Sequence, residues 1–371
     1  MATSDSESNV SSSSGTQKYF DSSDAPSDSE KVYLPRLDIC KLPERKLIKN
    51  LRFGRAKLRY IASLVKDDLR PKRNTNFALN LEQRVCVCLR ILTSGSFQDV
   101  VGDAYGCSKQ SVSNYFERFL DAMLRHVHEI IRFPLDDYEW LHEQSGAFEY
   151  RGGQKGLFGC IGAVDGTHVY IIKPNEDGDC YYSKGGKKTS MNIQITSGHD
   201  QRILDVCARN PGGNHDSFVF KTSGLFDRLE AAAEDRKWSF YVIGDKGYAT
   251  SKLLVSPLRQ PSNPRESSFN ESLTKMRIVV EQAIGGVKQK FRAMHNTGGT
   301  LCYSPEKVSK IAVVACMLHN IRQFDEYGKN NEETDDSSDS EVENSDSESN
   351  SETSDDEDGI SFRQSLIDGM H

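Results

Sequence analysis

Three acidic side chains lie in segments whose other residues predict burial. Asp165 interrupts the apolar run IGAVDGTHVYI, Asp245 ends the apolar run YVIGD, and Glu281 lies in the helical pattern RIVVEQAIGGVKQKF. A buried charge is costly unless it is paired, protonated or bound to a cation. Residues of these types in these positions therefore have either separate structural roles or a common role at a cation site.

Each acid has a structural explanation of its own. Asp165 could accept hydrogen bonds from backbone N–H groups, and Asp245 could close a turn. Glu281 could pair with Arg277 or with Lys288 on the surface of its own helix. These explanations treat the three acids separately and require no cation.

The alternative is a shared metal site. Mg²⁺, with Mn²⁺ as a substitute, prefers oxygen ligands and keeps several waters. Two such ions about 4 Å apart could activate a water molecule and stabilise the leaving oxygen of a phosphodiester. Taken together, the positions favour convergence of Asp165, Asp245 and Glu281 on a pair of ions, so that we expect the three to serve as metal ligands and catalytic residues.

The helix that carries Glu281 has a predicted apolar stripe and a polar flank beside it. Lys288 and Arg292 lie on the same flank as Glu281, and Gly285 leaves room between them. Two cations on one flank of the helix could hold the phosphates of a nucleic acid near the carboxylate. The predicted core stripe comprises Val280, Ile284, Val287, Phe291 and Met294.

The elements that would position these acids follow from the periodicity of the sequence after residue 150. Apolar runs predict strands, and patterns of period 3.6 predict helices. Three strands, a helix, a strand and further helices indicate an α/β fold with a mixed sheet. Asp245 ends one strand, at the carboxyl edge where α/β proteins bind ligands. The predicted strands are 157–172, 191–200, 202–210 and 238–248, and the predicted helices are 215–233, 274–294 and 304–324.

The preceding region has a helical pattern throughout. Within it, residues 97–124 predict two helices joined at Gly106, with Ser108 as the N-cap of the second. The polar face of the second helix carries Lys109 and Asn114, which are typical of a helix-turn-helix that contacts DNA. A plain helical bundle is the alternative. Upstream, KLIKNLRFGRAKLRY predicts one basic helix that could lie on phosphates.

Charge is distributed unevenly along the 371 residues. The net charge is −7, but residues 1–30 carry −5 and residues 330–371 carry −14, which leaves +12 for the middle of the chain. A basic central region suits a polyanionic partner such as DNA, although a basic soluble domain without such a partner would look the same. The Ser-rich and acidic ends are typical of disorder.

Composition excludes several other classes. The nine cysteines include no CxxC pair, and we expect reduced thiols in an intracellular protein. No apolar stretch reaches 18 residues, so we expect no membrane span, and the acidic first residues do not resemble a secretion signal. We therefore divide the chain into a disordered tail (1–35), a helix-turn-helix-like helical domain (36–150), a catalytic domain (151–325) and a disordered acidic tail (326–371).

Several segments together resemble the PIF/Harbinger transposases and the Harbinger-derived nucleases of animals. The segments, in order, are TSGSFQDVVGDAYGCSKQSVS, DGTH, PGGNHD, GDKGY, RIVVEQAIGGVKQKF and YSPEKVSKIAVVACMLHN. The resemblance covers about residues 35–325 and implies an RNase H-like core of the DDE type. Its two Asp and one Glu correspond to Asp165, Asp245 and Glu281. His168, His215 and Asp216 match further motif positions and are supporting residues.

The resemblance also implies an activity and partners. It implies metal-dependent cleavage of DNA, with end joining in transposases, in a nuclear protein that works with a Myb-like DNA-binding partner and forms a homo-oligomer. The segment YYSKGGKKTSMN departs from the family pattern, and Lys184 is the candidate phosphate contact there. The alternative is a domesticated, catalytically silent DNA-associated protein with the same fold.

Overall fold

The computed structural model describes six stretches of the chain. Lys184, the tail predicted over residues 1–35 and most of the acidic tail predicted over 326–371 lie outside these stretches. The described residues are 42–71, 78–153, 157–183, 188–235, 238–323 and 354–370.

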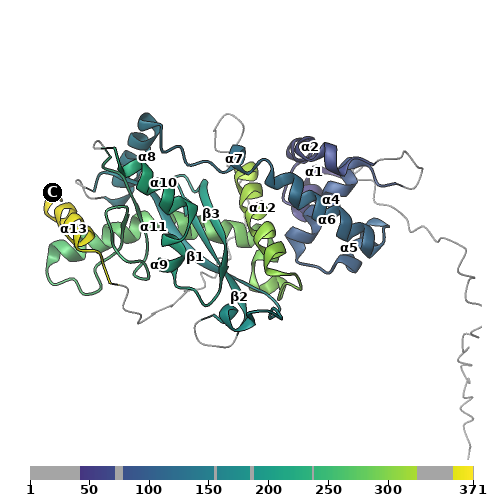
Figure 1. The fold of residues 1–371 in the computed structure, drawn as a ribbon. Helices are drawn as coiled ribbons and strands as arrows, with labels where there is room; N and C mark the ends of the chain where they lie inside the picture. The colour runs from purple at the N-terminus through teal and green to yellow at the C-terminus, as the bar shows by residue number, and fades with distance from the viewer. Residues whose placement is uncertain are drawn as a thin grey trace, which may run out of the picture.

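A five-stranded mixed sheet forms the centre of the molecule (Figure 1). Its order is β3-β2-β1-β4-β5; β1 pairs antiparallel with β2 and parallel with β4, β2 pairs antiparallel with β3, and β4 pairs parallel with β5. This sheet confirms the predicted α/β class and three of the four predicted strands closely, while the fourth is shorter than predicted. The strands are β1 (Cys160–Tyr170), β2 (Ser190–Ser197), β3 (Ile203–Pro211), β4 (Tyr241–Ile243) and β5 (Leu254–Val255).

Both faces of the sheet are covered. Ile161 and Val164 of β1 belong to a hydrophobic cluster that also contains Leu225 and Leu229 of α10. Ala163 points to the opposite cluster, which includes residues of α8, α11 and α12. Strands covered on both faces read as continuous apolar runs, which is why an acid within β1 stands out. The helices here are α8 (Tyr138–Gly152), α9 (Asp216–Lys221), α10 (Gly224–Ala233), α11 (Pro264–Lys290) and α12 (Pro305–Gln323).

The long helix α11 begins ten residues before the predicted one. Asn263 caps it by accepting a hydrogen bond from the backbone N–H of Glu266 at 2.9 Å, and Pro264 occupies the first helical turn, where a missing N–H costs nothing. All five residues of its predicted core stripe are buried. The stripe faces β1 and β2, which α11 contacts. The polar flank beside the stripe runs along the margin of this contact, and Glu281 on it is half exposed, with 49% of its side chain accessible.

The helical region before the sheet contains the two predicted helices α5 and α6. Gly106 adopts the left-handed conformation, with φ of 66°, and Ser108 caps α6 through the backbone N–H of Ser111, as predicted. No Cβ fits at Gly102, because it would lie 2.5 Å from the carbonyl oxygen of Cys107. The helices are α1 (Glu44–Leu51), α2 (Arg55–Leu64), α3 (Lys66–Leu69), α4 (Leu81–Ser94), α5 (Gln98–Tyr105), α6 (Lys109–Leu124) and α7 (Val127–Ile130).

The prediction of one basic helix over residues 46–60 is wrong, because the chain breaks between α1 and α2. Arg52 has φ of 67° and ends α1 in the left-handed conformation. The turn buries Phe53, whose ring lies 6.4 Å from that of Phe291 at the end of α11. A straight helix could not bury this ring, so a contact between segments far apart in sequence ends the helix.

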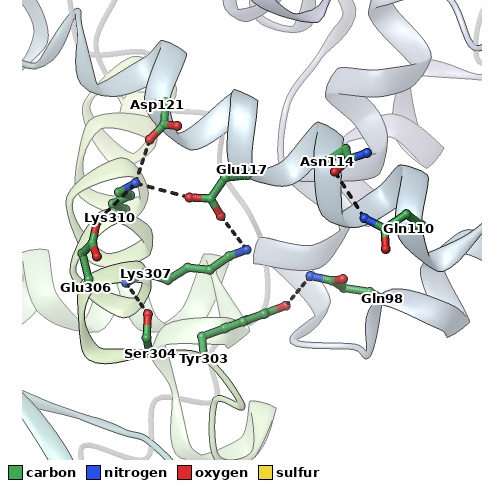
Figure 2. Close-up of polar contacts among 10 residues, drawn as sticks. All are labelled: Gln98, Gln110, Asn114, Glu117, Asp121, Tyr303, Ser304, Glu306, Lys307 and Lys310. Atoms are coloured by element: carbon green, nitrogen blue, oxygen red, sulfur yellow. Dashed lines mark hydrogen bonds and ion pairs between the residues drawn. The ribbon is translucent and has the colours of Figure 1, made fainter.

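The helical region is joined to the sheet region along α6 and α12 (Figure 2). Lys310 of α12 lies 2.9 Å from Asp121 and 3.2 Å from Glu117 of α6, and Lys307 lies 2.7 Å from Glu117. Beneath these ion pairs, the rings of Phe116 and Tyr303 lie 6.2 Å apart. One buried cluster runs through both regions, so α6 is held on the same body as the sheet.

The prediction of disorder over residues 326–371 is wrong for residues 354–370. These residues form α13 (Glu357–Gly369), which lies at the end of the molecule away from α5 (Figure 1). Leu366, Ile367 and Met370 are buried in the main cluster, and the ring of Phe362 packs on Tyr241 of β4. The apolar residues of α13 thus pack this segment against the rest of the fold.

None of the helices in the described stretches combines the length and the apolar character that crossing a membrane requires.

Candidate active site

The register of the sheet brings Asp165 and Asp245 to the same level. Strands β1 and β4 run parallel, and Ala163 pairs with Ile243. Asp165 and Asp245 each lie two residues beyond this pair. Because side chains alternate between the two faces of a sheet, both are expected on the face of Ala163 and Ile243, which α11 covers. Two residues far apart in the sequence thus reach one place because Asp165 lies within β1 and Asp245 follows its parallel neighbour β4.

A third aspartate faces this pair. Asp216 is the first residue of α9, and its Oδ1 accepts a hydrogen bond from Nδ2 of Asn192 at 2.9 Å. A Cβ built on Gly247 would lie 3.0 Å from Oδ1 of Asp245 and 3.5 Å from Oδ2 of Asp216. A Cβ on Gly166, beside Asp165, would lie 2.5 Å from Oδ1 of Asp216. The motifs DGTH, PGGNHD and GDKGY therefore meet, and their glycines leave space for the carboxylates.

Glu281 reaches the site through an arginine. Nη2 of Arg277 lies 3.5 Å from Oδ2 of Asp165 and 3.5 Å from Oε1 of Glu281. The Arg277 side chain is 14% exposed and that of Glu281 is 49% exposed. The guanidinium thus stands between the partly buried Asp165 and the more exposed Glu281. The sequence suggested the pairing of Arg277 with Glu281, but it gave no sign of the contact with Asp165.

The positive charge of Arg277 is not enough to neutralise the carboxylates of Asp165 and Asp245. Burial raises the pKa of Asp165 to about 7; Arg277 opposes this rise, whereas the neighbouring Asp245 and Asp216 add to it. Burial also raises the pKa of Asp245, against the effect of Arg277. Raised pKa values of this kind mark carboxylates that one guanidinium does not fully neutralise. An additional cation would lower the electrostatic cost of keeping both ionised.

Two buried oxygens at the site have no hydrogen-bond partner among the described residues. They are the hydroxyl of Tyr248, whose pKa is raised by burial and then by Asp216, Asp165 and Asp245, and Oδ1 of Asn192. Tyr248 was not predicted as a site residue, although its place at the end of GDKGY could have indicated it. Unpaired oxygens beside carboxylates suit an oxygen-preferring cation or its bound waters.

The donor set fits Mg²⁺, with one restriction. In the described part of the chain, no three acidic, His or Cys side chains are grouped closely enough to hold a metal ion. Mg²⁺ in enzymes commonly takes one or two protein carboxylates and completes its shell with waters and substrate phosphates. Asp165 and Asp245 can provide that pair, whereas Glu281 is separated from them by the guanidinium of Arg277.

The supporting residues surround this pair. Nδ1 of His168 lies 3.0 Å from the hydroxyl oxygen of Ser190 on β2. Burial lowers the pKa of His168, Asp216 opposes this, and Lys288 lowers it further, so Lys288 acts on the same part of β1. His215 stands at the N-cap position of α9, next to Asp216.

The predicted nucleic-acid contacts differ in their positions. Arg292 is exposed in the short 3-10 helix η4 (Arg292–Met294), directly after α11, and one of its nitrogens lies 3.4 Å from the carbonyl oxygen of Thr297. Lys109 and Asn114 are exposed on α6. Asn114 lies away from the ion pairs that join α6 to α12 (Figure 2). The two groups therefore lie on different elements, although η4 itself packs against α4 of the helical region.

Comparison with known proteins assigns the family. Residues 164–320 match the DDE superfamily endonuclease family. The chain is 30% identical to human HARBI1, described as a candidate nuclease, over 78% of this chain and 80% of that protein. It is 29% identical to an ALP1-like protein of Arabidopsis thaliana, over 71% of this chain and 66% of that protein. No solved structure matches the chain.

The matched segment includes all three predicted acids, Asp165, Asp245 and Glu281. The resemblance inferred from the motifs is therefore confirmed at the level of the family. The chain belongs to the DDE superfamily endonucleases and is a homologue of HARBI1 and of the ALP1-like proteins.

Proposed function

We propose that the chain is a metal-dependent DNA endonuclease of the Harbinger type, built on an RNase H-like core. The observation that carries this proposal is the parallel register of β1 and β4, in which Ala163 pairs with Ile243; it supports a common site for Asp165 and Asp245, each two residues further on. Their raised pKa values and the unpaired oxygens of Tyr248 and Asn192 support a cation between them. Mg²⁺ is the expected ion, and Mn²⁺ is expected to substitute for it.

Each residue then has a role that its position supports. Asp165 and Asp245 would hold the cation, and Asp216 would keep the site negative from the side of α9. When bound, the ion would supply Lewis-acid polarisation of a phosphoryl oxygen and a lower pKa for bound water. Lys288, near His168 on the open flank of α11, would bind a phosphate of the scissile strand. His168, held by its contact with the hydroxyl of Ser190, would help to orient the neighbouring side chains of the site.

Glu281 would complete the site only after a change in Arg277. Because Nη2 of Arg277 contacts both Asp165 and Glu281, a second cation ligated by Glu281 would compete with this guanidinium. A DNA phosphate is a suitable alternative partner for Arg277, since arginine binds phosphate with two parallel hydrogen bonds. Binding of DNA would then draw Arg277 away from the carboxylates and free Glu281.

The DNA substrate implies further proposals about location and partners. The exposed face of α6, with Lys109 and Asn114, would either contact DNA or receive a Myb-like DNA-binding partner. We also propose a nuclear location, where the DNA substrate would be found, and a homo-oligomeric state. Imaging of the tagged protein tests its location, and light scattering of the purified protein tests its oligomeric state.

One observation favours a second function. Arg277 already compensates part of the charge of Asp165 and Glu281, as expected of a protein that has kept the fold and lost the metal. In that case the chain would be a DNA-associated binding protein without nuclease activity. The two functions differ in their response to divalent cations, because only the nuclease needs them.

Nicking of supercoiled DNA with Mg²⁺ or Mn²⁺ distinguishes the two functions. The nuclease predicts activity in the wild type and its loss in Asp165→Asn, Asp245→Asn and Glu281→Gln. Asp205→Asn is the matched control, because Asp205 is a partly buried acid of β3 that pairs with Arg228 instead. Full activity in a variant would remove that residue from the site, and no metal-dependent nicking by the wild type would favour the silent protein.

A further inference from the structure

The end of the chain docks on the loop that follows Asp245. This loop runs from the end of β4 to the start of β5. Residues 354–370 lie against it, although they are separated from the rest of the described chain by 30 residues. The prediction of a disordered acidic tail gave these residues no role. Their contacts concentrate on Thr250, a fully buried residue five positions after Asp245.

Both backbone polar groups of Thr250 are bonded to the docked segment. The N–H of Thr250 donates to Oδ1 of Asp355 at 2.9 Å, and its carbonyl oxygen accepts from the N–H of Asp356 at 3.1 Å. The Thr250 side chain faces Ser256, with 2.8 Å between the two hydroxyl oxygens. Buried backbone groups require partners, so removal of the docked segment would leave the N–H and C=O of Thr250 to find others.

Arg363 of α13 adds side-chain hydrogen bonds to the contact between Thr250 and the docked segment. It is 8% exposed, and it donates to the Thr250 hydroxyl at 3.2 Å and to the carbonyl oxygen of Ser256 at 3.3 Å. Its other terminal nitrogen lies 3.0 Å from Oδ2 of Asp355. The Arg363 guanidinium therefore connects three residues: Thr250 in the loop, Ser256 directly after β5, and Asp355, which also bonds the N–H of Thr250.

Close backbone contact requires glycine at one point of α13. A Cβ on Gly359 would lie 2.5 Å from Cα of Ser251 and 2.7 Å from the carbonyl oxygen of Thr250. Real Cβ atoms do not approach backbone this closely, so any larger residue at 359 would push α13 off the loop. Gly369, at the other end of the same helix, has nothing within 4 Å of a Cβ.

The same loop is held on its inner side by α9. The hydroxyl oxygen of Ser217 accepts from the N–H of Ala249 at 2.6 Å and lies 3.2 Å from the carbonyl oxygen of Gly247. The N–H of Gly247 in turn donates to Oδ1 of Asp245 at 2.9 Å. The loop is thus fixed at Gly247 and Ala249 from inside and at Thr250 from outside, and Asp245 lies at its start.

We propose that α13 is a positioning element for Asp245: the C-terminal segment clamps Thr250 and thereby holds the loop whose Gly247 fixes the Asp245 carboxylate. This inference rests on the proposed function only in its consequence for metal binding. Groups that orient a metal ligand typically affect metal affinity by 10- to 100-fold. An apparently dispensable acidic tail would then contain a part of the active-site support.

Two glycine variants of the full chain test the proposal. Gly359→Ala should displace α13, whereas Gly369→Ala is the matched control with the same chemical change and open space. Alanine favours helix over glycine at both positions, so loss of helix propensity cannot explain a difference. Amide hydrogen exchange at single-residue resolution and titration with Mn²⁺ in the absence of DNA give two readouts, and neither depends on nuclease activity.

The expected results separate docking from positioning. In Gly359→Ala, the amides of Thr250 and Gly247 should exchange at least about tenfold faster, and Mn²⁺ should bind about tenfold more weakly. Gly369→Ala should match the wild type in both. Unchanged exchange at Gly247 would overturn the proposal, even if Thr250 exchanges faster, because α13 would then dock without holding Asp245.

A second variant guards against a general folding defect. Arg363→Lys keeps a cation but cannot bridge Thr250, Ser256 and Asp355 together, so it should raise exchange at Gly247 while amides of β2 stay protected. If β2 amides lose protection equally, α13 stabilises the whole fold and the proposal is wrong. If the wild type binds no Mn²⁺, the proposed function fails, and the exchange at Gly247 still decides the positioning role.

Discussion

Asn320, near the end of α12, forms hydrogen bonds with three backbone groups of two other segments. Its Oδ1 accepts from the N–H of Ile203 at 2.9 Å, and its Nδ2 donates to the carbonyl oxygens of Ile203 at 2.8 Å and of Ile130 at 3.1 Å. The amide thus continues the pairing of the edge strand β3. Asn320 is 5% exposed, so water would not readily replace it.

The substitution Asn320→Ala should lower the free energy of unfolding by about 3 kcal/mol. The three hydrogen bonds contribute about 1 kcal/mol each, and the buried groups of Ile203 left without partners add to the loss. Asn320→Asp keeps the acceptor but loses the donor and adds a buried charge, so it should destabilise at least as much near neutral pH. Both effects would arise without any contact with the acids of the site.

Urea denaturation followed by circular dichroism measures this loss. The slope of the transition should stay that of the wild type, because the surface exposed on unfolding is unchanged. A loss below about 1 kcal/mol in Asn320→Ala would refute the reasoning, since it would mean that β3 obtains its partners elsewhere. The matched control is Asn270→Ala. Asn270 of α11 also forms hydrogen bonds with both backbone groups of one residue, Leu258. Leu258 lies in a partly exposed loop, so the loss of stability should be smaller.

Three further predictions concern the helices around the site. Burial lowers the pKa of His319 to about 4, so the folded protein binds fewer protons than the unfolded one below about pH 6.5. The free energy of unfolding should therefore fall by about 3 kcal/mol between pH 6.5 and pH 4. His319→Gln should remove this part of the pH dependence when denaturation is measured at several pH values. Gly285→Ala should stabilise α11 by about 1 kcal/mol, because no atom lies within 4 Å of a Cβ at this position and alanine favours helix over glycine. A simultaneous loss of DNA binding in a filter assay would indicate that DNA lies on the flank of α11 that carries Gly285. Lys310→Met should cost about 1 kcal/mol or less, since its partners on α6 are half exposed, and a larger loss in thermal unfolding would contradict that reading of the α6–α12 contact.

Local patterns in the sequence were enough to predict the sheet region. The apolar runs gave β1, β2 and β3, and the stripe from Val280 to Met294 gave the buried side of α11. Ser108 and Gly106 predicted the turn between α5 and α6 because capping and left-handed conformations depend on a few neighbouring residues. The acids could be singled out because a charge within such apolar runs is costly.

Contacts between distant segments could not be predicted in this way. The break at Arg52 depends on the packing of Phe53 against Phe291, which no local pattern contains. The ordered end of the chain depends on Arg363 and Gly359 fitting against a loop that precedes them by about a hundred residues. The contact of Arg277 with Asp165 joins a helix to a strand, so only the fold reveals that this guanidinium separates Glu281 from the two aspartates.

The central claim is that Asp165 and Asp245 together hold a divalent cation. Titration of Mn²⁺ into the metal-free protein, followed by isothermal calorimetry for the wild type and for Asp245→Asn, tests this claim without DNA. The account predicts binding by the wild type and an affinity at least about tenfold lower in the variant, since one of two carboxylate ligands is lost. Equal affinities in the two proteins would contradict it.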